Sequence, residues 1–208
     1  WSSDVCSSDL STVSFICVGT PNKKNGELNM KYIYNVIDSI APPLKLKKEK
    51  HIIVVRSTVY PGTGDMIENY LFKKFNLKKN IDFVVISNPE FLREGTAIYD
   101  YFNPPYTLIG SNNNDAIKKI KKLYQNINSE VIIADRKISE IIKYVNNSFH
   151  ALKVSFANEI GNISKSLDID SHKLMDIFCK DKILNISNYY FKPRSEEHTS
   201  ELQSPCNL

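Results

Sequence analysis

Cysteine and glycine are scarce in this chain of 208 residues, which has four cysteines and seven glycines. Cys17 and Cys179 lie far apart, so they give neither the spacing of a metal site nor a disulfide framework. No apolar run is long enough to span a membrane, and no secretory signal is recognisable. These absences favour a reducing, cytoplasmic location. Because Cys17 lies within an apolar strand pattern, we expect it to be a small core residue.

The glycine-rich fingerprint G-x-G-x-x-G of dinucleotide-binding folds is also missing. The nearest pattern, Gly62-Thr63-Gly64, follows a later strand and lacks the third glycine. If the fold binds a dinucleotide, we expect the βαβ unit that holds the phosphates to precede Ser11.

The two ends differ in composition from the rest of the chain. Residues 1–10 and 194–208 are richer in serine than the lysine-, isoleucine- and asparagine-rich body. The tail matches the translation of a sequencing adapter, and the head matches the reverse complement of the same adapter in another frame. We therefore expect both ends, which hold the other two cysteines, to be non-native. Residues 11–193 are then expected to be an internal fragment of a longer gene product.

Positive charge exceeds negative charge in this sequence. The net charge is +4 for the whole chain and +8 without the two ends, which hold one arginine and five carboxylates. Such a surplus favours nucleic acid, a membrane surface or a phosphorylated metabolite as partner. Much of it lies in lysine runs such as 45–48 and 118–122, which are typical of solvated faces. Since no nucleic-acid motif accompanies these runs, a basic nucleic-acid-binding module is the remote alternative and neither nucleic acid nor membrane is the expected partner.

Short apolar segments alternate with helical patterns through the first 135 residues. Strands are expected at 13–18, 51–56, 83–86, 106–109 and 131–134. The second strand is almost entirely apolar, which suits a parallel strand covered on both faces. The alternation predicts an α/β fold whose domain 11–135 is part of a Rossmann-like, doubly wound parallel sheet.

After residue 135 the apolar residues recur at intervals of three and four. Over 138–167 this spacing predicts one amphipathic helix of roughly 30 residues. Asp170 is expected to cap a following helix that runs through Phe178. We therefore expect a domain boundary at 135, with a long central helix opening an α-helical dimerisation and substrate domain in 136–193.

Residues 87–95 read Ser-Asn-Pro-Glu-Phe-Leu-Arg-Glu-Gly and follow a predicted strand. Pro89 cannot donate to a strand ladder, so the strand should end there. If the next turn is helical, Glu90 and Glu94 lie on one face beyond the carboxyl end of the strand, where open parallel sheets bind ligands. Two surface glutamates on a solvated loop are the simpler alternative.

A polar stripe of Lys143, Asn147 and His150 runs along the predicted long helix, with Asn158 close to the same line. Such a stripe is usually the wet face of a helix, yet this one includes small residues that favour close approach by another element. The spacing of these residues supports a polar binding cleft and a solvent-exposed helix face equally.

Four motifs occur in one order along the chain: CVGTP at 17–21, VRSTVYPGT at 55–63, NPEFLREG at 88–95 and K-x-x-x-N at 143–147. Together they resemble the UDP-glucose/GDP-mannose dehydrogenase family. The resemblance covers essentially all of 11–193. The chain resembles members that oxidise GDP-mannose more than members that oxidise UDP-glucose, and oxidation of UDP-glucose remains the alternative activity. The features that favour GDP-mannose are Lys23-Lys24-Asn25-Gly26, His150 and the segments 156–162 and 184–190.

The resemblance implies an NAD-dependent enzyme that oxidises the C6 alcohol of a nucleotide sugar to a carboxylate, with two hydrides passing to two NAD⁺. Lys143 is expected to stabilise negative charge on the reacting oxygen, and Asn147 to donate a hydrogen bond to it. Glu90 and Thr58 are expected to position a water molecule, and Thr20 and Thr58 to contact NAD. The residues expected to bind the nucleotide sugar are Phe91, Leu92, Arg93, Glu94, Lys143, Asn147, His150, Asn158, Tyr189, Tyr190 and Lys192.

Three departures from the family pattern bear on the chain itself. The nucleophilic cysteine, expected in a Gly-Gly-Ser-Cys segment, would come shortly after residue 193, and Cys179 lacks that context. The glycine fingerprint is missing as well, so the 208-residue chain is expected to bind NAD weakly or not at all and not to turn over. Lys192 stands where arginine is expected, which keeps the charge but loses the bidentate fork.

The resemblance also implies a homodimer formed through the long helix. Val154, Ala157 and Gly161 give this helix a face of small residues, which would allow close approach by a second copy. A metal site is not expected.

Overall fold

The computed structural model describes residues 11–182, and the chain forms two compact units, Trp1–Ser148 and Phe149–Leu208. The first unit contains a five-stranded sheet in the order β1-β2-β3-β4-β5. The strands are β1 (Val13–Ile16), β2 (His51–Val55), β3 (Phe83–Ser87), β4 (Thr107–Gly110) and β5 (Val131–Ala134). The predicted α/β fold with a mostly parallel sheet is therefore confirmed.

The sheet departs from a wholly parallel one between β3 and β4. These two strands pair antiparallel at Ser87 and Gly110, whereas the other neighbouring strands pair parallel. The connection between them carries only α3 (Ala97–Phe102), a helix of six residues. Such a helix is too short to return the chain along the sheet, as the crossover helix between parallel strands does.

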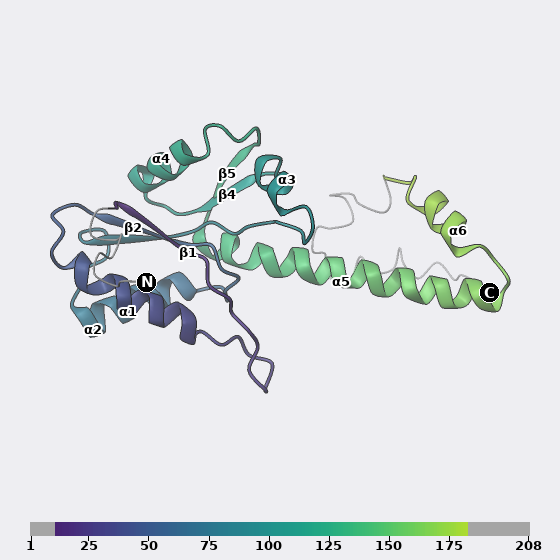
Figure 1. Ribbon diagram of the computed structural model, residues 1–208, viewed down its shortest axis with the longest axis horizontal. Coiled ribbons are helices and arrows are strands. Elements are labelled where there is room, and N and C mark those ends of the chain that lie inside the picture. The colour runs from purple at the N-terminus through teal and green to yellow at the C-terminus, as the bar shows by residue number, and fades with distance from the viewer. Residues whose placement is uncertain (1–10, 183–208) are drawn as a thin grey trace, which may run out of the picture. The chain divides into compact units, whose positions relative to one another are not determined.

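Helices cover both faces of this sheet (Figure 1). α1 (Lys31–Leu44) and α2 (Thr63–Phe75) pack on one face, and α4 (Asn114–Leu123) packs on the other. Alternate residues of β2 divide between the two cores: Ile53 and Val55 lie in the first, Ile52 and Val54 in the second. The apolar run of β2 thus reflects a strand buried on both faces, as predicted.

β1 is shorter than the sequence predicts, and Cys17 is not a core residue. The backbone N–H groups of Arg56 and Ser57 both donate to the carbonyl of Ile16, at 3.0 and 3.1 Å, so the ladder closes at that residue. Cys17 follows as an exposed, unbridged thiol.

The long helix is α5 (Arg136–Ser166), which has 31 residues and confirms the predicted length. In the second unit, Asp170 caps α6 (Ser171–Phe178), because its side chain accepts the backbone N–H groups of His172 and Lys173. Of the helices within 11–182, none combines the length and apolarity required to cross a membrane.

Candidate functional site

Lys143 and Glu90 form an ion pair beyond the carboxyl end of β3. The Nζ of Lys143 lies 2.9 Å from Oε1 of Glu90, and the two side chains are 13% and 29% exposed. Partial shielding from water strengthens such an interaction relative to an open surface. The Nζ also lies 5.8 Å from the ring centre of Phe91. The fold thus brings together three of the predicted site residues, two from a loop and one from α5.

The loop that carries Glu90 is not helical, so Glu90 and Glu94 do not share a helix face as the sequence suggested. The second carboxylate oxygen of Glu90 accepts the backbone N–H of Leu92 at 2.6 Å, which orients the carboxylate. Glu94 is exposed in a turn that includes Gly95, whose φ of +82° favours glycine.

A buried asparagine anchors this loop to the sheet. The side-chain amide of Asn88, which is 1% exposed, donates to the carbonyl of Leu108 at 2.8 Å. Its oxygen accepts from Arg56 at 2.8 Å and from the hydroxyl of Tyr124. Since these bonds tie the loop to β4, α4 and the end of β2, they hold Glu90 in place.

Arg93 is held by an internal ion pair. Its backbone N–H and guanidinium donate to Asp100 at 2.7 to 3.0 Å. The guanidinium and N–H of Arg93, together with the Thr96 hydroxyl, hold the pKa of the Asp100 carboxyl well below its usual range. The N–H groups of Leu92 and Arg93 are therefore both engaged, by Glu90 and by Asp100 of α3, and a ligand could use them only if these bonds opened.

The two predicted threonines meet at the carboxyl ends of β1 and β2. The hydroxyl of Thr20 donates to the backbone carbonyl of Thr58 at 2.8 Å, and both residues are half-buried. The carboxyl edge of a parallel sheet is where open α/β folds bind their ligands.

The other predicted residues lie elsewhere or outside the described part of the chain. Asn147 is exposed on α5, one turn beyond Lys143. His150 and Asn158 are exposed in the second unit. The three remaining residues lie outside the described residues: Tyr189, Tyr190 and Lys192.

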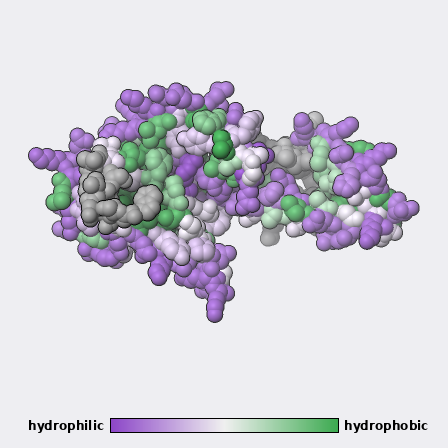
Figure 2. Space-filling view, viewed as in Figure 1, coloured by the Kyte–Doolittle hydropathy of each residue, from purple (hydrophilic) through white to green (hydrophobic). Residues whose placement is uncertain are grey.

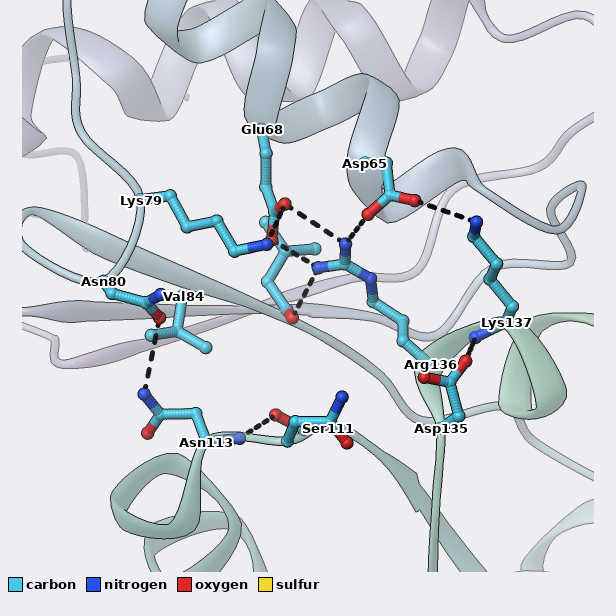
Figure 3. A pocket seen from close by; sticks show the side chains of 12 residues that line it. Asp65, Glu68, Lys79, Asn80, Val84, Ser111, Asn113, Asp135, Arg136 and Lys137 are labelled. Carbon is cyan, nitrogen blue, oxygen red and sulfur yellow. Dashed lines mark hydrogen bonds and ion pairs between the residues drawn. The ribbon is translucent and has the colours of Figure 1, made fainter.

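A network of ion pairs at the start of α5 was not anticipated from the sequence (Figure 3). The guanidinium of Arg136 lies between the carboxylates of Asp65 and Glu68 and also donates to the carbonyl of Val85 at 3.1 Å. Lys79 lies 2.8 Å from Glu68. Because these charges neutralise one another, we interpret the ion pairs that line this pocket as a structural network that joins α2, β3 and α5.

Two surfaces of the first unit stand out by their polarity. The hairpin closed by the bridge between Asn22 and Leu28 projects from the unit and is strongly hydrophilic, with the predicted Lys23-Lys24-Asn25-Gly26 segment at its tip (Figures 1 and 2). Figure 2 also shows apolar surface over α3, where Ile98 is 80% exposed.

Comparison with protein families gives two adjacent matches. Residues 2–128 match the NAD binding domain of the UDP-glucose/GDP-mannose dehydrogenase family, and residues 137–196 match its central domain.

Curated relatives support the same assignment. The chain is 46% identical over 184 residues to GDP-mannose 6-dehydrogenase of Pseudomonas aeruginosa, an alignment that covers 88% of this chain and 42% of that protein. It is 40% identical over 163 residues to UDP-glucose 6-dehydrogenase of Rickettsia bellii, covering 77% of this chain and 36% of that protein. The chain thus spans less than half the length of these relatives.

Solved structures agree with the sequence comparison. The chain superposes with a TM-score of 0.84 and 45% identity on a ternary complex of the Pseudomonas aeruginosa GDP-mannose dehydrogenase, covering 88% of this chain and 42% of that one. With a UDP-glucose dehydrogenase of Pyrobaculum islandicum, the TM-score is 0.79 at 32% identity, covering 84% and 40% of the two chains.

Proposed function

Because this chain belongs to the UDP-glucose/GDP-mannose dehydrogenase family, we propose that it forms part of a nucleotide-sugar 6-dehydrogenase that oxidises GDP-mannose to GDP-mannuronate. The observation that carries this proposal is the ion pair of Lys143 and Glu90 at 2.9 Å, beyond the end of a buried parallel strand. A partly shielded cation beside a carboxylate suits a reaction in which an alcohol loses a proton and a water molecule must later be activated.

Each group of this pair has a role in the proposed reaction. The ammonium of Lys143 stabilises negative charge that develops on the C6 oxygen as its proton leaves. Asn147, one turn further along α5, donates a hydrogen bond to the same oxygen. The carboxylate of Glu90, oriented by the N–H of Leu92, accepts a proton from the water that hydrolyses the thioester formed on the nucleophilic cysteine of the family, and Thr58 helps to position that water.

NAD is the proposed cofactor, and when bound it accepts the hydride that leaves C6. Thr20 and Thr58 fit this role because they lie in contact, half-buried, at the carboxyl ends of neighbouring parallel strands. They would contact the end of the dinucleotide that faces the substrate.

GDP-mannose is the preferred substrate of the proposal, and UDP-glucose is the alternative. The test is NADH formation by the protein encoded by the complete reading frame that contains residues 11–182. We expect GDP-mannose to give at least about tenfold higher kcat/KM than UDP-glucose. Polar groups of a site that hydrogen-bond the base and sugar of one nucleotide sugar are left without partners when the other nucleotide sugar binds. A higher kcat/KM with UDP-glucose would make UDP-glucose the proposed substrate. If neither nucleotide sugar gave NADH, the proposed function would be contradicted.

We also propose that the enzyme is a cytoplasmic homodimer joined through α5. The motivating observations are the exposed side chain of Val154 and the position of Gly161, which lies seven residues later and thus on the same helix face, where an added Cβ would have no other described atom within 4 Å. Sedimentation equilibrium of the same protein should give the mass of a dimer, because such an apolar helix face is stabilised when a second copy covers it. A monomeric mass at micromolar concentration would contradict this expectation.

A further inference from the structure

Polar side chains on the first two turns of α5 contact α2, β3 and the loops that follow β2 and β3. Arg136 binds α2 and β3 through its guanidinium. Ser139, which is fully buried, lies 3.0 Å from the hydroxyl of Ser87, just before the loop that carries Glu90. Glu140 faces the turn that precedes α2, and Lys143 follows three positions later on the same side of the helix. These contacts fix α5 against the loops at the carboxyl ends of β2 and β3.

Glu140 makes the most specific of these contacts. Its side chain is 3% exposed, and its two oxygens each accept one backbone N–H, from Gly62 at 2.5 Å and from Gly64 at 2.8 Å. Gly62 is the N-cap of α2 and has no side chain with which to satisfy the N–H groups of the first turn. The carboxylate of Glu140 therefore caps α2 from another helix, at the end where a negative charge is favourable.

The turn that Glu140 holds continues directly from the proposed site. Thr58 lies four residues before Gly62, and its carbonyl accepts the hydroxyl of Thr20. Three positions after Glu140, Lys143 binds Glu90. We propose that Glu140 is a positioning residue, which fixes the loop of Thr58 relative to the ammonium of Lys143 without touching substrate. The catalytic consequence of this role rests on the proposed function, whereas the clamp itself can be tested without turnover.

The clamp is testable in the 208-residue chain labelled with ¹⁵N-glycine, which gives only seven amide signals. The signals of Gly62 and Gly64 should shift together as one carboxyl titrates. Burial raises the pKa of Glu140 against the opposing effect of the two amides and Arg136, so this step should lie above the ordinary range of glutamate. Asp65, the other carboxylate facing it, should titrate lower, because the effect of burial, which raises its pKa, is outweighed by Arg136 and Lys137 together.

Glu140→Gln should abolish the shared step, because a carboxamide does not titrate, and it offers one acceptor oxygen where the carboxylate offers two. One of the two glycine amides should then exchange with solvent at least about tenfold faster. Glu130→Gln, at an exposed glutamate, is the matched control and should leave both signals unchanged. Independent titration of Gly62 and Gly64 in the wild-type chain, or a shared step that survives in Glu140→Gln, would overturn the clamp.

In the complete reading frame, Glu140→Gln should lower kcat at least about tenfold while KM for the nucleotide sugar stays within about twofold, because displacement of the Thr58 loop affects the reacting geometry more than binding. Glu130→Gln should leave both parameters unchanged. A normal kcat combined with released glycine amides would overturn the positioning role. A wild-type enzyme that reduces no NAD⁺ would instead refute the proposed function, and the glycine titration would still decide whether the clamp exists.

Discussion

Replacement of Lys143 by alanine is expected to lower kcat about 100- to 1,000-fold with either nucleotide sugar, as is typical when a group that stabilises an oxyanion is removed. The ammonium is partly shielded from solvent and lies 2.9 Å from Glu90. In the alanine variant, a water molecule at this place would compensate poorly for the lost positive charge. The loss should fall mainly on kcat, because the charge that Lys143 stabilises develops only as the alcohol is oxidised. The measurement is steady-state NADH formation by the protein of the complete reading frame.

The matched control for this prediction is Lys137→Ala. Lys137 lies on the same helix but is 64% exposed, and it pairs with Asp65 at 3.5 Å, away from Glu90. Its replacement should change kcat by less than about twofold, since exposed ion pairs contribute little. Lys143→Arg keeps the charge in a different geometry and should retain more activity than Lys143→Ala. If Lys143→Ala kept a fifth or more of the wild-type kcat, Lys143 would not be the oxyanion-stabilising group.

Gly110→Ala is expected to reduce the free energy of unfolding by about 2 to 3 kcal/mol, the upper part of the range for overpacking of a closely packed site. A Cβ at this position would overlap the side chain of Ser139 and lie 3.0 Å from the Cα of Arg136. Backbone cannot move aside as a flexible side chain can, so α5 would have to shift away from β4. Urea denaturation of the 208-residue chain measures this change.

Gly161→Ala is the matched control for the same denaturation experiment, carried out at a concentration at which the chain is monomeric. Gly161 lies within α5, and a Cβ added there would meet no other described atom within 4 Å. Alanine is favoured over glycine inside a helix by up to about 1 kcal/mol, so this substitution should be neutral or stabilising. Equal destabilisation by the two substitutions would contradict close packing of α5 at Gly110.

Local patterns in the sequence were sufficient to predict the elements that depend on near neighbours. The periodicity of three and four predicted α5, and the position of Asp170 before an amphipathic segment predicted the cap of α6, because both involve contacts within a few residues. Burial of β2 on both faces could likewise be inferred, since a short, continuous apolar run within an α/β pattern is typical of a central parallel strand.

The contacts that arrange the site could not be predicted in the same way. Glu140 binds amides that lie 76 and 78 residues away, and no local spacing relates them. The only hint in the sequence is that Ser139 and Glu140 are two polar residues among the isoleucines of an apolar segment. A spacing of four between Glu90 and Glu94 was compatible with a helix, yet the loop is not helical there.

Family resemblance placed Lys143 and Glu90 in one site, which composition and periodicity could not. It named both residues for one reaction, and the fold places them 2.9 Å apart. It did not indicate that the N–H groups of Leu92 and Arg93 are engaged by Glu90 and Asp100. Those bonds depend on how the loop folds back on itself, which a motif does not specify.

The ratio of NADH formed to GDP-mannose consumed tests the central proposal most directly. Conversion of an alcohol to a carboxylate removes two hydrides, so the protein of the complete reading frame should form two NADH for each GDP-mannose, with a single acid as product. Formation of one NADH with accumulation of an aldehyde, or no NADH from GDP-mannose at all, would contradict the account.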